Sequence, residues 1–175
     1  DEDRHKTEQY KANAARVQSQ KVFADFDKYL ESLDIRITIE PADEFNVQRI
    51  AQMTQKTNQF NLTTKRYTDA DVRNFIGQGW KIWCIGVADK FGDNGITGTV
   101  MVSGDEIDTF LLSCRILGKG IEVAFIKKVC AMLAESGAGS LKAKYIPTAK
   151  NAQVKDFYEK CGFTCLMENR DGSKE

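Results

Sequence analysis

The stretch Asp108-Thr-Phe-Leu-Leu-Ser-Cys-Arg-Ile-Leu-Gly-Lys-Gly-Ile-Glu122 decides the fold. Its apolar first part predicts a strand over Ile107–Leu112, and apolar residues at helical spacing predict a helix over Ile121–Ser136. A tight Arg-x-x-Gly-x-Gly turn joins the two. The N–H groups of such a turn and the positive end of the helix dipole favour an anion, so the turn predicts a phosphorylated ligand. An ordinary strand-to-helix turn is the alternative.

Strands and helices alternate on both sides of this stretch. The period of the apolar residues defines these elements, and Gly, Pro and Asn residues mark their ends. Further strands are expected at Ile35–Ile39, Lys81–Val87, Ile96–Val102, Leu141–Ile146 and Phe163–Met167, and further helices at Glu44–Gln55, Thr68–Ile76 and Asn151–Cys161. Hairpins come first and a strand-helix-strand crossover follows. This order predicts an α/β fold with a mixed sheet of about six strands flanked by helices.

The first 33 residues are highly charged, with sparse apolar residues at nearly helical spacing. They predict one long connector helix that leads from an upstream domain into a domain over residues 34–175. The chain lacks an initiator Met, which favours a fragment of a longer protein. The only histidine, His5, lies in this helix, so a catalytic role for histidine is not expected.

Composition excludes several classes of function. Acidic and basic residues number 25 each, so no overall charge favours nucleic acid or an anionic membrane. Five cysteines without paired Cys-x-x-Cys spacing predict neither a disulfide scaffold nor a metal site, and they fit the reducing cytoplasm. No apolar run reaches the roughly 20 residues that span a bilayer.

Two motifs, about thirty residues apart, carry a resemblance to a known family. Arg115-x-x-Gly118-x-Gly120 resembles the phosphate-binding turn of GNAT acyltransferases, and Asn151-Ala-Gln-Val-Lys-Asp-Phe-Tyr158-Glu-Lys-Cys-Gly-Phe163 resembles their later helix. The stretches Thr57–Tyr67, Ile107–Gly120 and Tyr145–Asn151 look like the C-terminal GNAT-like module of FkbH-like proteins. Those proteins carry a HAD-type phosphatase domain and load a glyceryl unit onto an acyl carrier protein. No Asp-x-Asp-x-Thr/Val phosphatase motif occurs in this sequence.

The resemblance implies a binding site for phosphopantetheine, carried by coenzyme A or by an acyl carrier protein. In GNAT proteins the strand before the turn splays from its neighbour, and its main chain accepts the pantetheine arm. The implied binding residues are Phe110, Leu112, Arg115, Gly118, Lys119, Gly120 and Asn151. Arg115 could instead pair with Glu122, and Asn151 could cap a helix.

Three residues are candidates for the chemistry. Tyr158 matches the GNAT tyrosine that protonates the leaving sulfur, with packing on the last strand as the alternative. Asp108 is the candidate base because a carboxylate is unusual in an apolar strand, and partial burial would make it more basic. A structural hydrogen bond to the carboxylate is the alternative. Cys114, next to the turn, is the candidate carrier of the acyl unit as a thioester, against simple packing.

A polar cluster between two expected helices is the candidate substrate site. The resemblance places this stretch beside the acyl pocket, where small polar side chains suit a hydroxylated acyl group. The residues are Asn58, Asn61, Thr63 and Thr64. A self-capping loop is the alternative, because Asn and Thr satisfy main-chain groups locally.

Together these features predict an acyltransferase, one half of a bifunctional phosphatase and acyltransferase. It would transfer a small hydroxyacyl, glyceryl-like unit to or from a phosphopantetheine thiol, without a metal. Two other functions stay open: a non-catalytic module of the same fold that docks a carrier protein, and an acetyl-CoA-dependent N-acetyltransferase.

Overall fold

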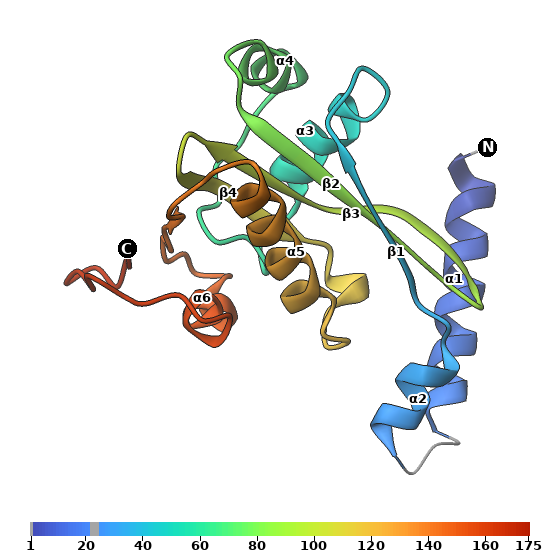
Figure 1. Cartoon of the computed structure of the whole chain (residues 1–175). Helices are drawn as coiled ribbons and strands as arrows, with labels where there is room; N and C mark the ends of the chain where they lie inside the picture. The colour runs from blue at the N-terminus through green and yellow to red at the C-terminus, as the bar shows by residue number, and fades with distance from the viewer. Residues whose placement is uncertain (1, 22–24) are drawn as a thin grey trace. The chain divides into compact units, whose positions relative to one another are not determined.

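The computed structural model describes residues 2–21 and 25–175 (Figure 1). The chain divides into two compact units, which are described separately. Unit 1 holds the described residues within 1–38 together with 86–96, and unit 2 holds 39–85 and 97–175. A five-stranded sheet has the strand order β1-β2-β3-β4-β5.

Unit 1 contains two helices, α1 (Glu2–Gln20) and α2 (Phe26–Ser32), in place of the single helix expected over the first 33 residues. A new helix begins at α2 because the Asp25 side chain caps it by accepting a hydrogen bond from the Asp27 amide. Tyr29 and Leu33 are its buried residues. Residues 1 and 22–24 of the expected connector lie outside the described residues.

The sheet is mixed, as predicted. Its strands are β1 (Arg36–Pro41), β2 (Lys81–Asp89), β3 (Gly92–Ser103), β4 (Glu106–Leu112) and β5 (Lys142–Ala143). β3 pairs with β4 antiparallel, and β4 pairs with β5 parallel. The last six residues of β4 are all buried, as the apolar run indicated.

In unit 2 the helices are α3 (Val47–Lys56), α4 (Asp69–Gly77), α5 (Ile121–Glu135) and α6 (Phe157–Lys160), with short 3₁₀ turns η1 (Cys114–Ile116) and η2 (Ala152–Val154). α5 lies in front of the sheet in the view of Figure 1, and its apolar stripe, Ile121, Phe125, Ile126, Val129 and Leu133, is buried. The predicted helix over Asn151–Cys161 is divided into η2 and α6.

The C-terminal part differs most from expectation. β5 covers two residues because the chain then leaves β4: the Tyr145 amide donates to Lys174 O at 2.9 Å and the Ile146 amide to Leu62 O at 2.8 Å. Residues 163–167 form no strand. The amides of Leu166 and Met167 bond instead to Glu175 O. The sheet therefore has five strands where about six were expected.

Candidate active site

The glycine turn lies between β4 and α5, where the sequence predicted it. The Ser113 hydroxyl accepts a hydrogen bond from the Arg115 amide and so starts η1. Gly118 and Gly120 have φ of +76° and +73°, a conformation in which residues with a Cβ are strained. No atom outside the neighbouring residues lies within 4 Å of either missing Cβ. Both glycines are therefore required by the main-chain conformation and not by crowding within the protein.

Glu122 occupies the first turn of α5, directly after the glycine turn. Its Oε2 atom is buried and has no hydrogen-bond partner among the described residues. A carboxylate at this point already complements the positive end of the helix dipole. It also repels any second anion placed there.

The edge of β4 that the resemblance assigned to the pantetheine arm is occupied by the protein itself. The Leu112 amide donates to Phe60 O at 3.0 Å, and Phe110 O accepts from the Leu62 amide at 3.1 Å. We call residues Phe60–Thr63 the strap. It also bonds to the other side, since Leu62 O accepts from the Ile146 amide. The strap thus fills the gap between β4 and the chain after β5.

Asn151 is fully buried and binds the strap through its side-chain amide. Its Nδ2 donates to Asn61 O and to Ile146 O, both at 2.9 Å. Its Oδ1 accepts from the Thr148 amide at 2.7 Å and from the Tyr145 hydroxyl at 3.3 Å. A side-chain amide has two N–H groups and an oxygen with two lone pairs, so these four hydrogen bonds use its full hydrogen-bonding capacity. It makes no capping bond to η2 either.

These contacts concern the implied roles of Phe110, Leu112 and Asn151. The resemblance implied that groups of these residues bind a pantetheine arm. Here the same groups already bind consecutive residues of the strap. In this structure the Leu112 amide, the Phe110 carbonyl oxygen and the Asn151 side chain are bound within the protein itself.

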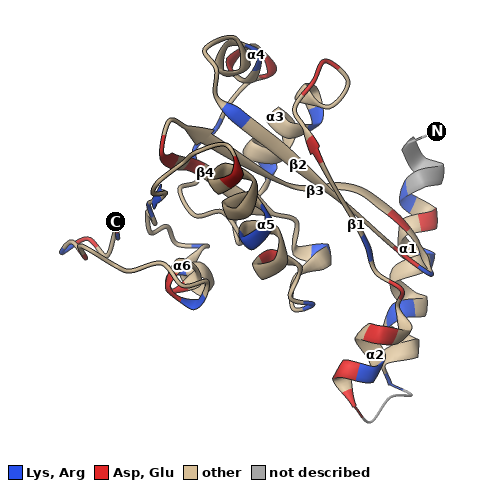
Figure 2. Cartoon of the chain, viewed as in Figure 1, with Lys and Arg blue, Asp and Glu red and all other residues tan. Residues whose placement is uncertain are grey.

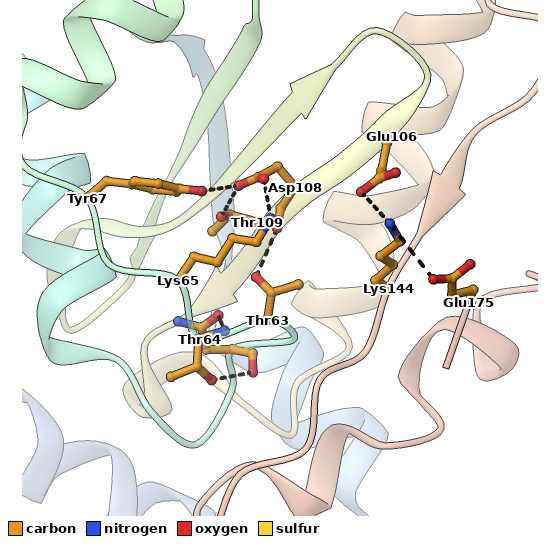
Figure 3. A network of polar contacts seen from close by, with 10 residues as sticks. Thr63, Thr64, Lys65, Tyr67, Glu106, Asp108, Thr109, Lys144 and Glu175 are labelled. Carbon is orange, nitrogen blue, oxygen red and sulfur yellow. Dashed lines mark hydrogen bonds and ion pairs between the residues drawn. The ribbon is translucent and has the colours of Figure 1, made fainter. Parts of the chain in front are cut away.

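Asp108 lies at the centre of a polar network (Figure 3). Its carboxylate accepts from Lys65 Nζ at 2.5 Å, from the Tyr67 hydroxyl at 2.8 Å and from Thr109 Oγ1 at 2.9 Å. Burial, and then the hydrogen bond to Asp108, raise the pKa of Tyr67 above its ordinary value. The Asp108 carboxylate thus accepts from three donors, which fits the structural reading of Asp108.

Tyr158 is 6% exposed, and its hydroxyl is buried without a hydrogen-bond partner among the described residues. Burial first, then the nearby Cys161 and Cys130 thiols, raise the pKa of Tyr158 above its ordinary value, so the phenol is protonated at neutral pH. It lines a cavity of about 650 Å³, the tyrosine pocket, with both cysteines. Lys144, which pairs with Glu106 at 3.3 Å (Figure 3), also lines this cavity.

A second cavity of about 760 Å³ opens at the end of β4. Its wall includes Cys114, which is exposed, and Asn58. The charged residues of the wall are all basic: Arg49, Lys56, Arg115 and Lys150. We call this cavity the basic pocket. Cys114 and Tyr158 line different pockets, so the structure does not bring these two catalytic candidates together.

Most of the predicted substrate cluster is engaged within its own loop. Asn61 is fully buried, with Nδ2 donating to Thr57 O and Oδ1 accepting from the Thr64 amide. Thr63 Oγ1 donates to Asp108 O at 2.9 Å. Asn61 and Thr64 thus fit the self-capping alternative, whereas Thr63 bonds to the main chain of β4. Asn58 accepts a hydrogen bond from Arg66 and also faces the basic pocket.

Sequence reasoning missed the basic residues of α3. Arg49 and Lys56 are seven residues apart, two helical turns, so the sequence already placed them on one face. Basic residues at this spacing are usual on any solvated helix face, so the pattern alone did not mark a site.

The cysteines differ in their surroundings. Burial, followed by the charge of Glu40, raises the pKa of the Cys84 thiol to about 11. Burial also raises the pKa of Cys130 and Cys161. Cys114 and Cys165 are exposed. Across the part of the chain that the structure describes, no three His, Cys, Asp or Glu side chains are grouped to hold a metal ion.

No protein-family model matches the sequence, and no curated protein matches it. Solved structures do match the fold. An alanine N-acetyltransferase of a ribosomal protein from Escherichia coli has a TM-score of 0.56 at 15% identity, over 79% of this chain and 88% of that one. An acetyltransferase assigned to the GNAT family from Desulfovibrio desulfuricans has 0.57 at 12%, over 79% and 94%. The NatC complex bound to Gag peptide and CoA has 0.56 at 13%, over 79% and 94%.

These likenesses establish the GNAT fold for this chain. They span nearly the whole length of the matched proteins, at sequence identities that carry the fold alone. In a separate respect, none of the described helices is both long and apolar enough to cross a membrane.

Proposed function

We propose that this chain is an acyltransferase that moves a small hydroxyacyl unit, such as glyceryl, to or from a phosphopantetheine thiol. The thiol belongs to an acyl carrier protein or to coenzyme A in the cytoplasm, and a HAD-type phosphatase domain lies upstream in the same protein. The GNAT fold supports an acyltransferase, because the matched structures include N-acetyltransferases and one with bound CoA. The observation that carries the proposal is the exposed Cys114 thiol in the wall of the basic pocket.

A thiol in this position is suited to covalent catalysis. The thiolate is the nucleophilic form of a cysteine, and exposure lets a ligand reach it. The Cys114 thiolate attacks the acyl carbonyl of a thioester donor, a new C–S bond forms, and the donor thiolate leaves. In the second step an acceptor thiolate attacks the Cys114 thioester and releases the Cys114 thiolate. Each step exchanges one thiolate for another, so no net proton moves and Asp108 is not needed as a base.

One observation favours the N-acetyltransferase as a second candidate. The Tyr158 hydroxyl has no hydrogen-bond partner among the described residues, and its raised pKa keeps it protonated. An amine acceptor loses a proton and the leaving sulfur gains one, which is the chemistry that such an acid assists. The two candidates differ in the residue that matters, Cys114 for thioester exchange and Tyr158 for amide formation.

The test is acyl loading of the full-length protein. The protein is incubated with a radiolabelled glyceryl thioester of a carrier protein or of coenzyme A, and the isolated protein is treated with hydroxylamine, which cleaves thioesters. We expect hydroxylamine-sensitive label that Cys114→Ala abolishes and Cys165→Ala, the other exposed cysteine, retains. Label that persists in Cys114→Ala, or no label on the wild type, would refute the covalent route.

A further inference from the structure

The charged residues that line the basic pocket are all basic. Arg49 and Lys56 line it from α3, a helix that carries basic residues (Figure 2), while Arg115 lines it from η1 and Lys150 from a loop. No Asp or Glu lines it. Within the described part of the chain, Lys56 and Lys150 have no carboxylate partner. Cationic side chains that share a cavity repel one another unless an anion lies between them.

Arg49 and Arg115 both line this pocket. The Arg49 guanidinium donates to Gln52 Oε1 at 2.5 Å, a neutral partner one helical turn away. Burial, and then the charge of Arg115, lower the pKa of Arg49. Two guanidinium groups from separate elements are thus held within electrostatic reach of each other beside a cavity. Such an arrangement is favourable once a polyvalent anion binds both.

The charges also separate this pocket from the glycine turn. The first turn of α5 carries Glu122, whose carboxylate opposes an anion at the Gly118–Gly120 amides. The lining of the basic pocket includes Arg115 but neither Gly118 nor Gly120, and no carboxylate lines it.

We propose that the basic pocket binds a phosphate ester through its cationic side chains, with Arg49 and Lys56 of α3 as recognition residues that neither sequence motif contains. This inference rests on the proposed function, because the phosphate ester belongs to a substrate of the proposed acyl transfer. Two sources carry this chemistry, the phosphodiester of a pantetheine arm and a phosphate on the acyl unit itself. Cys114 shares the pocket, so the bound phosphate orients the reacting ligand beside the thiol.

The experiment measures binding by isothermal titration calorimetry with the full chain. The probes are 4′-phosphopantetheine against pantetheine, and glycerol 3-phosphate against glycerol. We expect at least one phosphorylated probe to bind about tenfold or more tightly than its unphosphorylated counterpart, since hydrogen bonds to charged groups are the strong ones. The pair that shows the difference identifies the source of the phosphate.

Variants locate the site. Arg49→Gln and Lys56→Gln should each weaken the phosphorylated probe about tenfold and leave its counterpart unchanged. Lys128→Gln removes a cation from the exposed face of α5 and should leave all affinities unchanged. Arg49→Lys should recover part of the affinity, because it keeps the charge and loses the planar fork. Equal binding within both probe pairs, or pocket variants that behave like Lys128→Gln, would overturn the proposal.

Binding and acyl loading fail independently. Loss of Cys114 loading with the phosphate preference intact refutes the proposed function and leaves the phosphate site standing. Loading of Cys114 in a protein that shows no phosphate preference refutes the phosphate site and leaves the function standing.

Discussion

At the scale of single residues, the buried hydroxyl of Tyr158 gives the most direct test. A buried polar group without a partner loses its hydration and gains nothing in return, at a cost of about 1–3 kcal/mol. Tyr158→Phe removes only that oxygen, and we expect it to raise the free energy of unfolding by about 1 kcal/mol. Urea denaturation followed by circular dichroism measures the change.

Tyr145→Phe is the matched control. Tyr145 is equally buried, but its hydroxyl donates to Asn151 Oδ1, so its removal should lower the free energy of unfolding by about 1 kcal/mol. If Tyr158→Phe is instead the less stable protein, its hydroxyl has a partner in solution. A fall in acyl transfer in Tyr158→Phe, with loading of Cys114 unchanged, would restore the phenol to the role of acid.

The cysteines should differ in reactivity toward iodoacetamide, which alkylates thiolates. Cys114 and Cys165 are exposed and should react first at pH 8. Cys84 is buried with a pKa of about 11, so in the folded protein its thiolate forms only as the pH approaches that value. Peptide mass spectrometry over time gives the order. Cys84 modified as fast as Cys165 under native conditions would contradict this picture of the core.

At the scale of elements, the start of α4 shows a pattern that neighbouring residues encode on their own. Thr68 and Asp71 form a capping box: the Thr68 hydroxyl accepts from the Asp71 amide, and the Asp71 carboxylate accepts from the Thr68 amide. These hydrogen bonds, the one from the main chain first, lower the pKa of Asp71 below its ordinary value of 3.8. The sequence sufficed because the whole motif lies within four consecutive residues.

The capping box predicts a pH dependence with a definite sign. The pKa of Asp71 is lowered in the folded state, so its contribution is complete above the unfolded value and is lost as the pH falls through the folded pKa. Asp71→Asn should therefore destabilise the protein at neutral pH, and this deficit should disappear well below pH 3.8. Denaturation at both pH values measures it. Asp69→Asn, which removes a carboxylate from the same turn without a capping bond, should show a smaller deficit at neutral pH.

The strap shows the opposite case, in which local pattern is insufficient. In the sequence, residues 60–63 belong to a polar segment without helical periodicity between two expected helices. The sequence of β4 indicates a strand and gives no sign that its edge is paired. The hydrogen bonds between the two segments join residues about fifty positions apart, and no periodicity encodes such a pairing. The glycine turn was predictable because its conformation requires Gly118 and Gly120 themselves. The occupancy of the neighbouring strand edge depends on tertiary structure.

We expect the strap to stay in place when a ligand binds. Leu62 and Asn61 are fully buried, and both edges of the strap are hydrogen-bonded. The amides of Leu62 and Leu112 should therefore remain protected from hydrogen exchange when 4′-phosphopantetheine saturates the protein. Faster exchange at both amides, with the helix amides of α5 unchanged as the internal control, would show that the arm displaces the strap and adds to β4.

At the scale of the whole molecule, the sequence predicted the architecture better than the site. Strand-helix order is encoded by apolar periods along each segment, and the mixed sheet with its flanking helices followed from that order. Site residues such as Asp108 and Asn151 were assigned by chemical type alone. Their partners, Lys65 and Tyr67 for one and the strap for the other, come from segments 41 to 90 residues away. Those partners decide whether a polar side chain is free to bind a ligand.

Unit 1 contains a buried ion pair between Arg16 and Asp89. Among the described side chains of α1, Arg16 alone is buried, and it binds Asp89 with two hydrogen bonds of 2.6 and 2.7 Å. The side chains are 9% and 1% exposed. Removal of one partner leaves an uncompensated buried charge, which costs about 3–5 kcal/mol, whereas replacement of both by apolar residues is often neutral.

Asp89→Asn should therefore release α1 from unit 1 while unit 2 keeps its fold. The expected result is rapid hydrogen exchange and early tryptic cleavage over residues 6–20, with the α5 amides still protected. The double variant Arg16→Met with Asp89→Leu should restore protection of α1, because it removes both charges and keeps the volume. If α1 stays protected in Asp89→Asn, apolar contacts hold the helix and the ion pair is incidental. If the double variant also loses α1, the two charges are required as a pair, and burial alone does not hold this helix in its unit.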